Sequence, residues 1–153
     1  MSTSSSDGQG AVFAAPLTQD LGWILAPLLE LPHVTAGVVF SRDGLILGRS
    51  SDLLQETGEG MAALTGSALG VARTMVATGS SDGDAVADLV ISTREGGVYY
   101  VAPAGSGSGL VLWASRGVDM GRLAREVQVQ VSKLVQALDE ASKSRTPSTP
   151  PRS

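Results

Sequence analysis

Short glycine-containing turns between apolar runs constrain the fold of this 153-residue chain more than any other feature. Ser41-Arg42-Asp43-Gly44 joins the β-branched run 34–41 to a second run, 45–49. Three later runs, at about 85–93, 97–102 and 110–115, are joined by the turns 94–97 and 104–109. Strands connected by turns this short must be antiparallel. The sequence therefore predicts one five-stranded antiparallel sheet.

Three segments between and around these strands have helical periodicity. Leu17, Leu21, Ile24 and Leu28 predict a first helix at about 17–30, which Pro27 should kink or shorten because it lacks the backbone donor. A long helix is expected at about 54–78, and Asp119 should cap a last one that ends near residue 141. The order α-β-β-α-β-β-β-α predicts an α+β fold, a three-layer α/β/α sandwich.

The long middle helix divides into two arcs when its residues are projected at the helical period. We expect one arc to pack on the sheet, and it comprises Leu54, Met61, Leu64, Thr65, Ala68, Leu69, Val71, Ala72, Met75 and Val76. The opposite arc carries small side chains, at Ala63, Gly66, Ser67, Gly70, Thr74 and Ala77. Each of the two interior glycines costs about 1 kcal/mol of helix stability. Small residues let a second backbone approach, so this ridge predicts a helix–helix contact with an identical chain, as in a homodimer.

The run at 85–93 follows this helix directly and is apolar on both sides. A strand of this kind is covered on both faces and, at a sheet edge, needs protection or a pairing partner. Val86, Asp88 and Val90 therefore join the predicted dimer interface.

Composition removes several classes of chemistry. The net charge is −4 and cysteine is absent, which excludes disulfides, thiol catalysis and cysteine-based metal sites. His33 is the single histidine, so no metal cluster or Ser–His–acid triad is expected. The Walker pattern does not occur, and we interpret Gly105-Ser106-Gly107-Ser108-Gly109 as a flexible hairpin. We therefore predict no enzymatic activity, no cofactor and no metal.

The ends and the surface lead to further expectations. We expect disordered tails at 1–15 and 142–153 around a folded domain at 16–141. Basic residues are scattered, so no nucleic-acid contact is predicted. No apolar run is long enough for a membrane span, and Met1 to Gly10 lack the features of a secretory signal, so we expect a cytoplasmic protein without membrane insertion.

Several local patterns resemble the roadblock family, named for a dynein light chain, and especially its small bacterial members. The matching stretches are Leu21 to Leu25, Val38 to Leu47, Gly97 to Val101 and Leu110 to Ala114, and the Ser-X-Asp-Gly-Leu hairpin is the most specific. Pro27 departs from the pattern. The resemblance implies a middle helix on one sheet face, terminal helices on the other, and dimerisation through the middle helix and third strand.

The resemblance also implies partners. Similar bacterial members are typically encoded beside a Ras-like small GTPase and a histidine-kinase-like membrane protein, and some relatives bind or activate GTPases. We therefore predict a homodimeric, non-enzymatic regulator in bacterial signal transduction that binds a Ras-like GTPase and modulates its cycle. Gln55, Glu59 and Arg73, at the margins of the middle helix, are the candidate partner contacts. The alternatives are a PAS- or GAF-like sensory domain with a small ligand and, with least support, an unrecognised hydrolase.

Overall fold

A computed structural model of the chain describes residues 20–145. Its elements, in chain order, are η2 (Gly22–Ile24), α2 (Ala26–Leu29), β1 (Val34–Phe40), β2 (Ile46–Arg49), α3 (Gln55–Gly79), β3 (Leu89–Ser92), β4 (Val98–Ala104), β5 (Ser108–Ala114) and α4 (Met120–Arg145). The five strands form one sheet in the order β2-β1-β5-β4-β3, and every neighbouring pair is antiparallel. The predicted fold class and order of elements are therefore confirmed.

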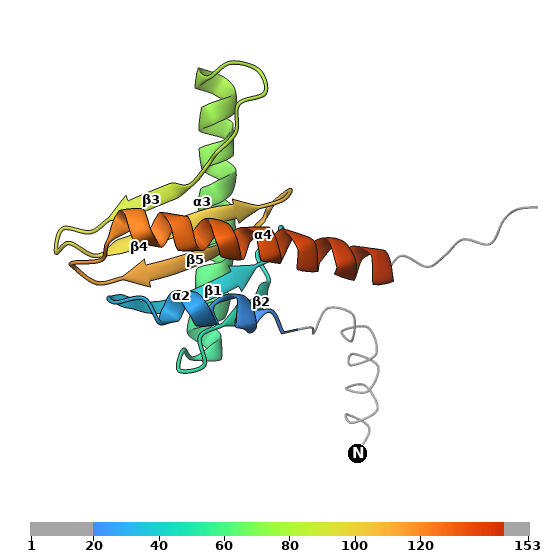
Figure 1. Cartoon of the computed structure of the whole chain (residues 1–153). Coiled ribbons are helices and arrows are strands. Elements are labelled where there is room, and N and C mark those ends of the chain that lie inside the picture. Colours follow the sequence, from blue (N-terminus) through green and yellow to red (C-terminus); the bar gives the residue numbers. More distant parts are fainter. Residues whose placement is uncertain (1–19, 146–153) are drawn as a thin grey trace, which may run out of the picture.

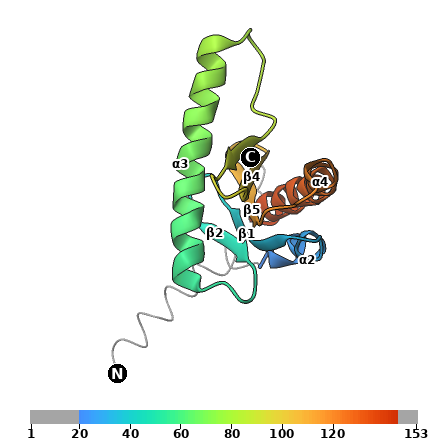
Figure 2. The ribbon, with the colours of Figure 1, turned by 90° about the vertical axis from the view of Figure 1, so that its left-hand side faces the viewer.

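The three layers are visible in Figures 1 and 2. The long helix α3 crosses one face of the sheet, while α2 and α4 cover the other. Beyond the sheet, the C-terminal end of α3 projects, and the connector to β3 returns along it (Figure 2). Part of α3 thus has no sheet beneath it.

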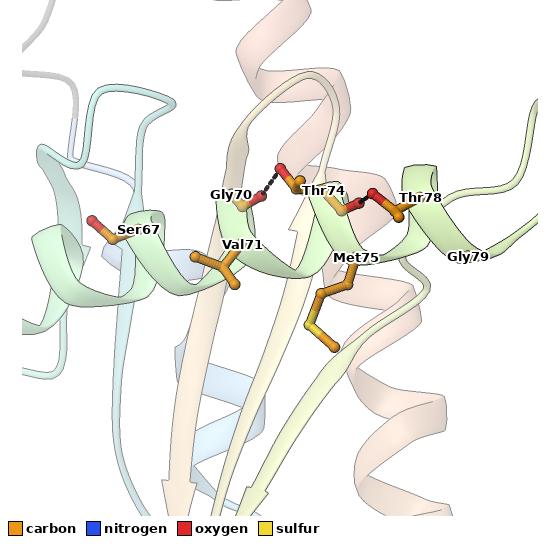
Figure 3. Close-up of a pocket in the computed structure, with 7 residues that line it drawn as sticks. All are labelled: Ser67, Gly70, Val71, Thr74, Met75, Thr78 and Gly79. Atoms are coloured by element: carbon orange, nitrogen blue, oxygen red, sulfur yellow. Dashed lines mark hydrogen bonds between the residues drawn. The ribbon is translucent and has the colours of Figure 1, made fainter.

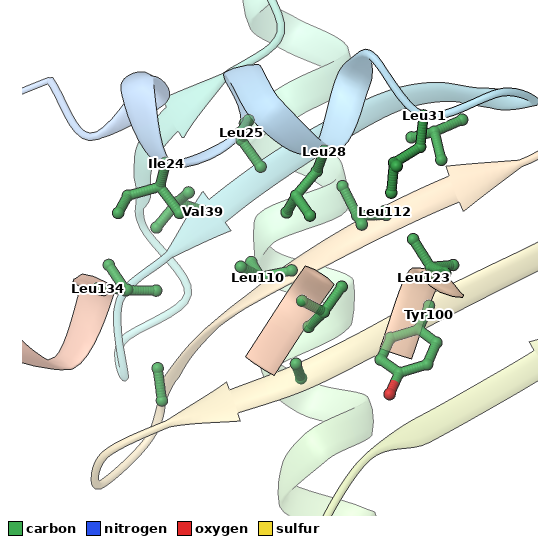
Figure 4. Packing of buried hydrophobic residues seen from close by; sticks show 14 of the residues in the cluster. Ile24, Leu25, Leu28, Leu31, Val39, Tyr100, Leu110, Leu112, Leu123 and Leu134 are labelled. Carbon is green, nitrogen blue, oxygen red and sulfur yellow. The ribbon is translucent and has the colours of Figure 1, made fainter. Parts of the chain in front are cut away.

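Two apolar clusters hold the layers together, one on each face of the sheet. Under α2 and α4, the leucines of both helices interdigitate with Val39, Tyr100, Leu110 and Leu112 of the strands (Figure 4). Gln130 lies in the buried stripe of α4 between Val127 and Leu134, and its Oε1 accepts no hydrogen bond. A buried polar atom without a partner destabilises the fold.

The predicted turns and caps occur as expected. Gly44 has a φ of 77°, in the left-handed region that favours glycine, and its N–H donates to the Ser41 carbonyl at 2.9 Å. Asp119 Oδ1 accepts from the N–H of Arg122 at 3.1 Å and so caps α4. The turn between β1 and β2 and the start of α4 were therefore predicted correctly.

Three boundaries differ from the prediction. The first helix is not continuous: within the described residues it consists of the short turns η2 and α2, with Pro27 in the first turn of α2. Proline is accepted there because the backbone N–H groups in the first turn of a helix have no acceptor within the helix, so the N–H that proline lacks breaks no hydrogen bond. Only Leu89–Ser92 pair as β3, and α4 continues to Arg145 instead of ending near residue 141. The predicted N-terminal tail lies outside the described residues.

Candidate functional site

The sheet-facing side of α3 is built mainly from small residues. Gly58, Ala62, Thr65 and Leu69 are the buried positions of this helix. A Cβ on Gly58 would lie 2.8 Å from the Cδ1 of Ile46, and one on Gly66 would lie 3.4 Å from the Cα of Gly44. These glycines therefore let α3 lie close to β2 and to the β1–β2 turn.

The opposite side of α3 carries large apolar residues that no part of the domain covers. Leu64, Val71 and Met75 are 68%, 62% and 68% exposed. The prediction that these three, together with Leu54, pack on the sheet is wrong. Small residues take the buried positions because the helix approaches the strands closely, and the large side chains are left outside.

Hydroxyl groups on this outer side are already used within the helix. Thr74 Oγ1 donates to the Gly70 carbonyl at 3.1 Å, and Thr78 Oγ1 donates to the Thr74 carbonyl at 2.8 Å (Figure 3). With their hydroxyls bonded to the backbone one turn earlier, these threonines add little polarity to the surface. Val71 and Met75 project beside them around a shallow hollow that begins at Ser67 (Figure 3).

The exposed positions also follow a coiled-coil spacing. Six of them, at Gly60, Leu64, Ser67, Val71, Thr74 and Thr78, have intervals that alternate between four and three residues. This is the spacing that keeps one seam of a helix against a partner helix. We call these six residues together with Met75 the outer seam of α3. Large and small side chains alternate along it.

The predicted small-residue ridge only partly coincides with the outer seam. Ser67, Gly70 and Thr74 are exposed, as are Ala63 and Ala77 on the flank. A Cβ on Gly70 would meet nothing within 4 Å, so a partner backbone could approach there. Gly66, in contrast, faces the β1–β2 turn.

The strand β3 forms the open edge of the sheet. At the opposite edge, the Leu21 N–H donates to the Leu47 carbonyl at 2.9 Å, so the chain itself lies along β2. Val90 and Ile91 on β3 are 42% and 48% exposed, and Ile91 was not among the predicted interface residues. Unpaired edge strands are ready to pair with another strand.

The other two predicted interface residues near this edge have partners within the domain. Val86 packs against the cluster under α3. Asp88 accepts a hydrogen bond from the Tyr100 hydroxyl at 2.8 Å, which anchors the chain just before β3. Burial, together with the hydrogen bond and charge of Asp88, raises the pKa of Tyr100 to about 12.

The three candidate partner contacts do not form one site. Gln55 accepts from Arg49 Nε at 2.9 Å and donates to Glu59 Oε2 at 2.8 Å, which links β2 to the first turns of α3. Arg73 lies several turns further along, partly buried on the sheet-facing side of the helix. The structure therefore brings Gln55 and Glu59 together and separates Arg73 from them.

The possible metal ligands are spread over the part of the chain that the structure describes. His33 is exposed in the turn before β1, with a positive φ of 74°. Between residues 20 and 145, no three His, Asp or Glu side chains gather as a metal site would require. No helix in the same range has the length and apolarity of a membrane span.

Comparison with known proteins identifies the domain. The Roadblock/LC7 domain model matches residues 21–114, which is more than half of the chain and includes all five strands and α3. This chain belongs to the Roadblock/LC7 family. Its α3 and β3 are the family's middle helix and third strand, and the arrangement of helices implied by the sequence resemblance is confirmed.

Solved roadblock structures share the fold. The Roadblock/LC7 domain from Streptomyces avermitilis is 29% identical, with a TM-score of 0.72 over 78% of this chain and 98% of that one. MglB from Myxococcus xanthus is 11% identical, with a TM-score of 0.68 over 78% and 94%. The gliding protein MglB from Thermus thermophilus is 16% identical, with a TM-score of 0.66 over 82% and 93%. A comparison with curated proteins found no match.

Proposed function

We propose that this roadblock chain is a homodimer whose contact is the outer seam of α3, continued at the edge of β3. The observation that carries the proposal is the exposure of Leu64, Val71 and Met75 on a helix that extends beyond its own sheet. Contiguous apolar surface of this kind marks an interaction site in soluble proteins. Coiled-coil spacing indicates that the partner element is another helix.

The alternation of large and small residues favours an antiparallel pair of helices. In a two-fold symmetric antiparallel contact, Leu64 of one copy can lie against Ser67 of the other, and Val71 against Gly60. A parallel pair would instead oppose Leu64 to Leu64 and Ser67 to Ser67, which leaves hollows at the small residues. The open β3 edges, with Val90 and Ile91, would then extend one sheet into the next.

We further propose that the dimer is a non-enzymatic regulator that binds a Ras-like small GTPase in bacterial signal transduction and modulates its cycle. Family membership supports this proposal. With the outer seam occupied by a second copy, Gln55 and Glu59 stay accessible at the start of α3. We assign the GTPase contact to these two residues.

Three further expectations, about a second partner, the location and the domain bounds, belong to this proposal. A histidine-kinase-like membrane partner is supported by the family resemblance alone. A cytoplasmic location follows from a GTPase partner and suits a chain without cysteine. We take residues 16–141 as the folded roadblock domain, with α4 continuing to Arg145.

Affinity capture from the native cell, followed by a hydrolysis assay, tests the GTPase proposal. The full chain should retain a protein with the phosphate-binding motif of small GTPases, and single-turnover GTP hydrolysis or nucleotide release should change when it is added. The double variant Gln55→Ala/Glu59→Ala should lose this effect while it remains a dimer. A captured GTPase whose affinity and nucleotide cycle are the same with this variant as with the unmodified chain would refute the assigned contact. Failure to retain any GTPase would refute the function.

A further inference from the structure

A cleft of about 410 Å³ lies on the sheet-facing side of α3, away from the outer seam. Three segments form it: Arg73 and Val76 on α3, Asp84 and Val86 on the connector to β3, and Pro103 and Gly105 at the β4–β5 hairpin. Arg73 follows Val71 by two positions, which is roughly 200° around a helix, so the cleft and the seam open on different sides. Its volume lies within the usual range of small-molecule sites.

Arg73 gives this cleft a positive charge without a fixed counter-ion. The side chain is partly buried, and it makes neither a hydrogen bond nor an ion pair with any residue from 20 to 145. The backbone N–H of Gly105, across the cleft, also donates to no group in that part of the chain. Guanidinium groups bind carboxylates and phosphates through paired, charge-assisted hydrogen bonds. The cleft can therefore hold the oxygen atoms of an anion.

The negative charge of Asp84 determines which class of anion the cleft should bind most tightly. One of its carboxylate oxygens accepts from the N–H of Ala85 at 2.9 Å, and the side chain lines the same cleft as Arg73. The lining thus carries one formal charge of each sign. A phosphate group, with about two negative charges at neutral pH, would be repelled by Asp84 more strongly than a carboxylate.

The rest of the lining is apolar. Val76, Val86 and Pro103 offer surface that a compact hydrocarbon group would cover. We infer that this cleft binds a small monocarboxylate with a compact apolar body, held by Arg73 at its charged end. The inference does not depend on the dimer or on a GTPase.

A titration followed by backbone amide NMR tests the site on the full chain. Phenylacetate is the probe, phenylacetamide is the neutral compound of the same shape, and inorganic phosphate is the competing anion, all at matched ionic strength and pH 7. Phenylacetate should shift the amide signals of Gly105 and Val86 saturably, with a dissociation constant in the low millimolar range. Phenylacetamide should give no saturable shift, and phosphate should bind more weakly.

Substitutions distinguish specific binding in the cleft from nonspecific electrostatic attraction between the anion and the protein surface. Arg73→Gln should weaken phenylacetate binding by about tenfold or more, because a charge-assisted pair is lost. Arg94→Gln, at the exposed β3–β4 turn, is the matched control and should leave the affinity unchanged. Asp84→Asn should strengthen phosphate binding relative to phenylacetate. If Arg73→Gln does not fold, Arg73→Lys, which keeps the charge but not the planar fork, should still weaken binding severalfold. Equal shifts with phenylacetamide, or shifts that both Arg73 variants leave intact, would overturn the inference.

Discussion

Replacement of Leu64 by alanine should weaken the dimer without unfolding the monomer. The side chain is 68% exposed in the single chain, so about two thirds of its surface is free to be buried by a second copy. The substitution removes three carbons, each of which contributes about 0.8 kcal/mol when fully buried, and about two thirds of that surface is buried on dimerisation. The dimer should therefore lose roughly 1.5 kcal/mol of association free energy per copy, or about 3 kcal/mol in total. The dissociation constant should therefore rise about a hundredfold. Sedimentation equilibrium over a range of protein concentrations measures this change directly.

Leu69→Ala is the matched control on the same helix. Leu69 is fully buried against the sheet, so its truncation should lower the free energy of unfolding by about 2–5 kcal/mol. Leu64→Ala should leave the unfolding free energy of the monomer nearly unchanged, because alanine has the higher helix propensity and little packing is lost. A dissociation constant that changes less than threefold, or a monomer destabilised as much as by Leu69→Ala, would refute the assignment of the outer seam.

Three further substitutions test separate parts of the account. Gly70→Glu should break the dimer and leave a folded monomer with unchanged or slightly higher helix stability, as seen by light scattering and circular dichroism, because a side chain there meets nothing within 4 Å in the single chain. Gln130→Leu should raise the free energy of unfolding in urea by about 1–3 kcal/mol, since it removes a buried oxygen without a hydrogen-bond donor; a lower value would show that the glutamine is satisfied. Stability should fall as the pH rises from about 10, the ordinary pKa of tyrosine, to about 12, the raised pKa of Tyr100, because the folded state holds the neutral phenol more strongly. Tyr100→Phe should abolish this loss, and an unchanged pH profile would contradict it.

The middle helix shows where sequence reasoning stops. Its length and position were predicted correctly. Its sheet-facing side was assigned correctly only in part. Thr65 and Leu69 are buried as predicted, whereas Leu64, Val71 and Met75 are exposed. Both sides of the helix carry apolar residues, and periodicity cannot say which of them meets the sheet. The distance between α3 and the sheet determines which side is buried. Gly58 and Gly66 allow α3 to lie against β2 and the β1–β2 turn, so the bulky side chains of Leu64 and Val71 remain outside. That closeness is a property of the assembled sheet.

Boundaries were predicted less well where tertiary contacts set them. Ser41 to Gly44 determines its own turn through local hydrogen bonds, and the hairpin was predicted from sequence. The strand β3 is shorter than its apolar run because the connector returns from the projecting end of α3, and Asp88 is held by Tyr100 twelve residues away. The cleft beside Arg73 joins three segments that are distant in sequence, so no local pattern could have revealed it.

A distance between the two copies of one residue tests the central claim most directly. The chain has no cysteine, so a spin label on Glu56→Cys, at the exposed start of α3, reports only on that position. If Leu64 of one copy lies against Ser67 of the other, the two labelled sites are about 19 residues apart along the helix axis, or about 30 Å, from the rise per residue and the spacing of packed helices. Pulsed electron–electron double resonance on the full chain should give a single distance near that value. Parallel helices would place the labels near 10 Å, which would broaden the continuous-wave spectrum instead. The absence of both this broadening and a pulsed dipolar signal at tens of micromolar protein would contradict the dimer itself.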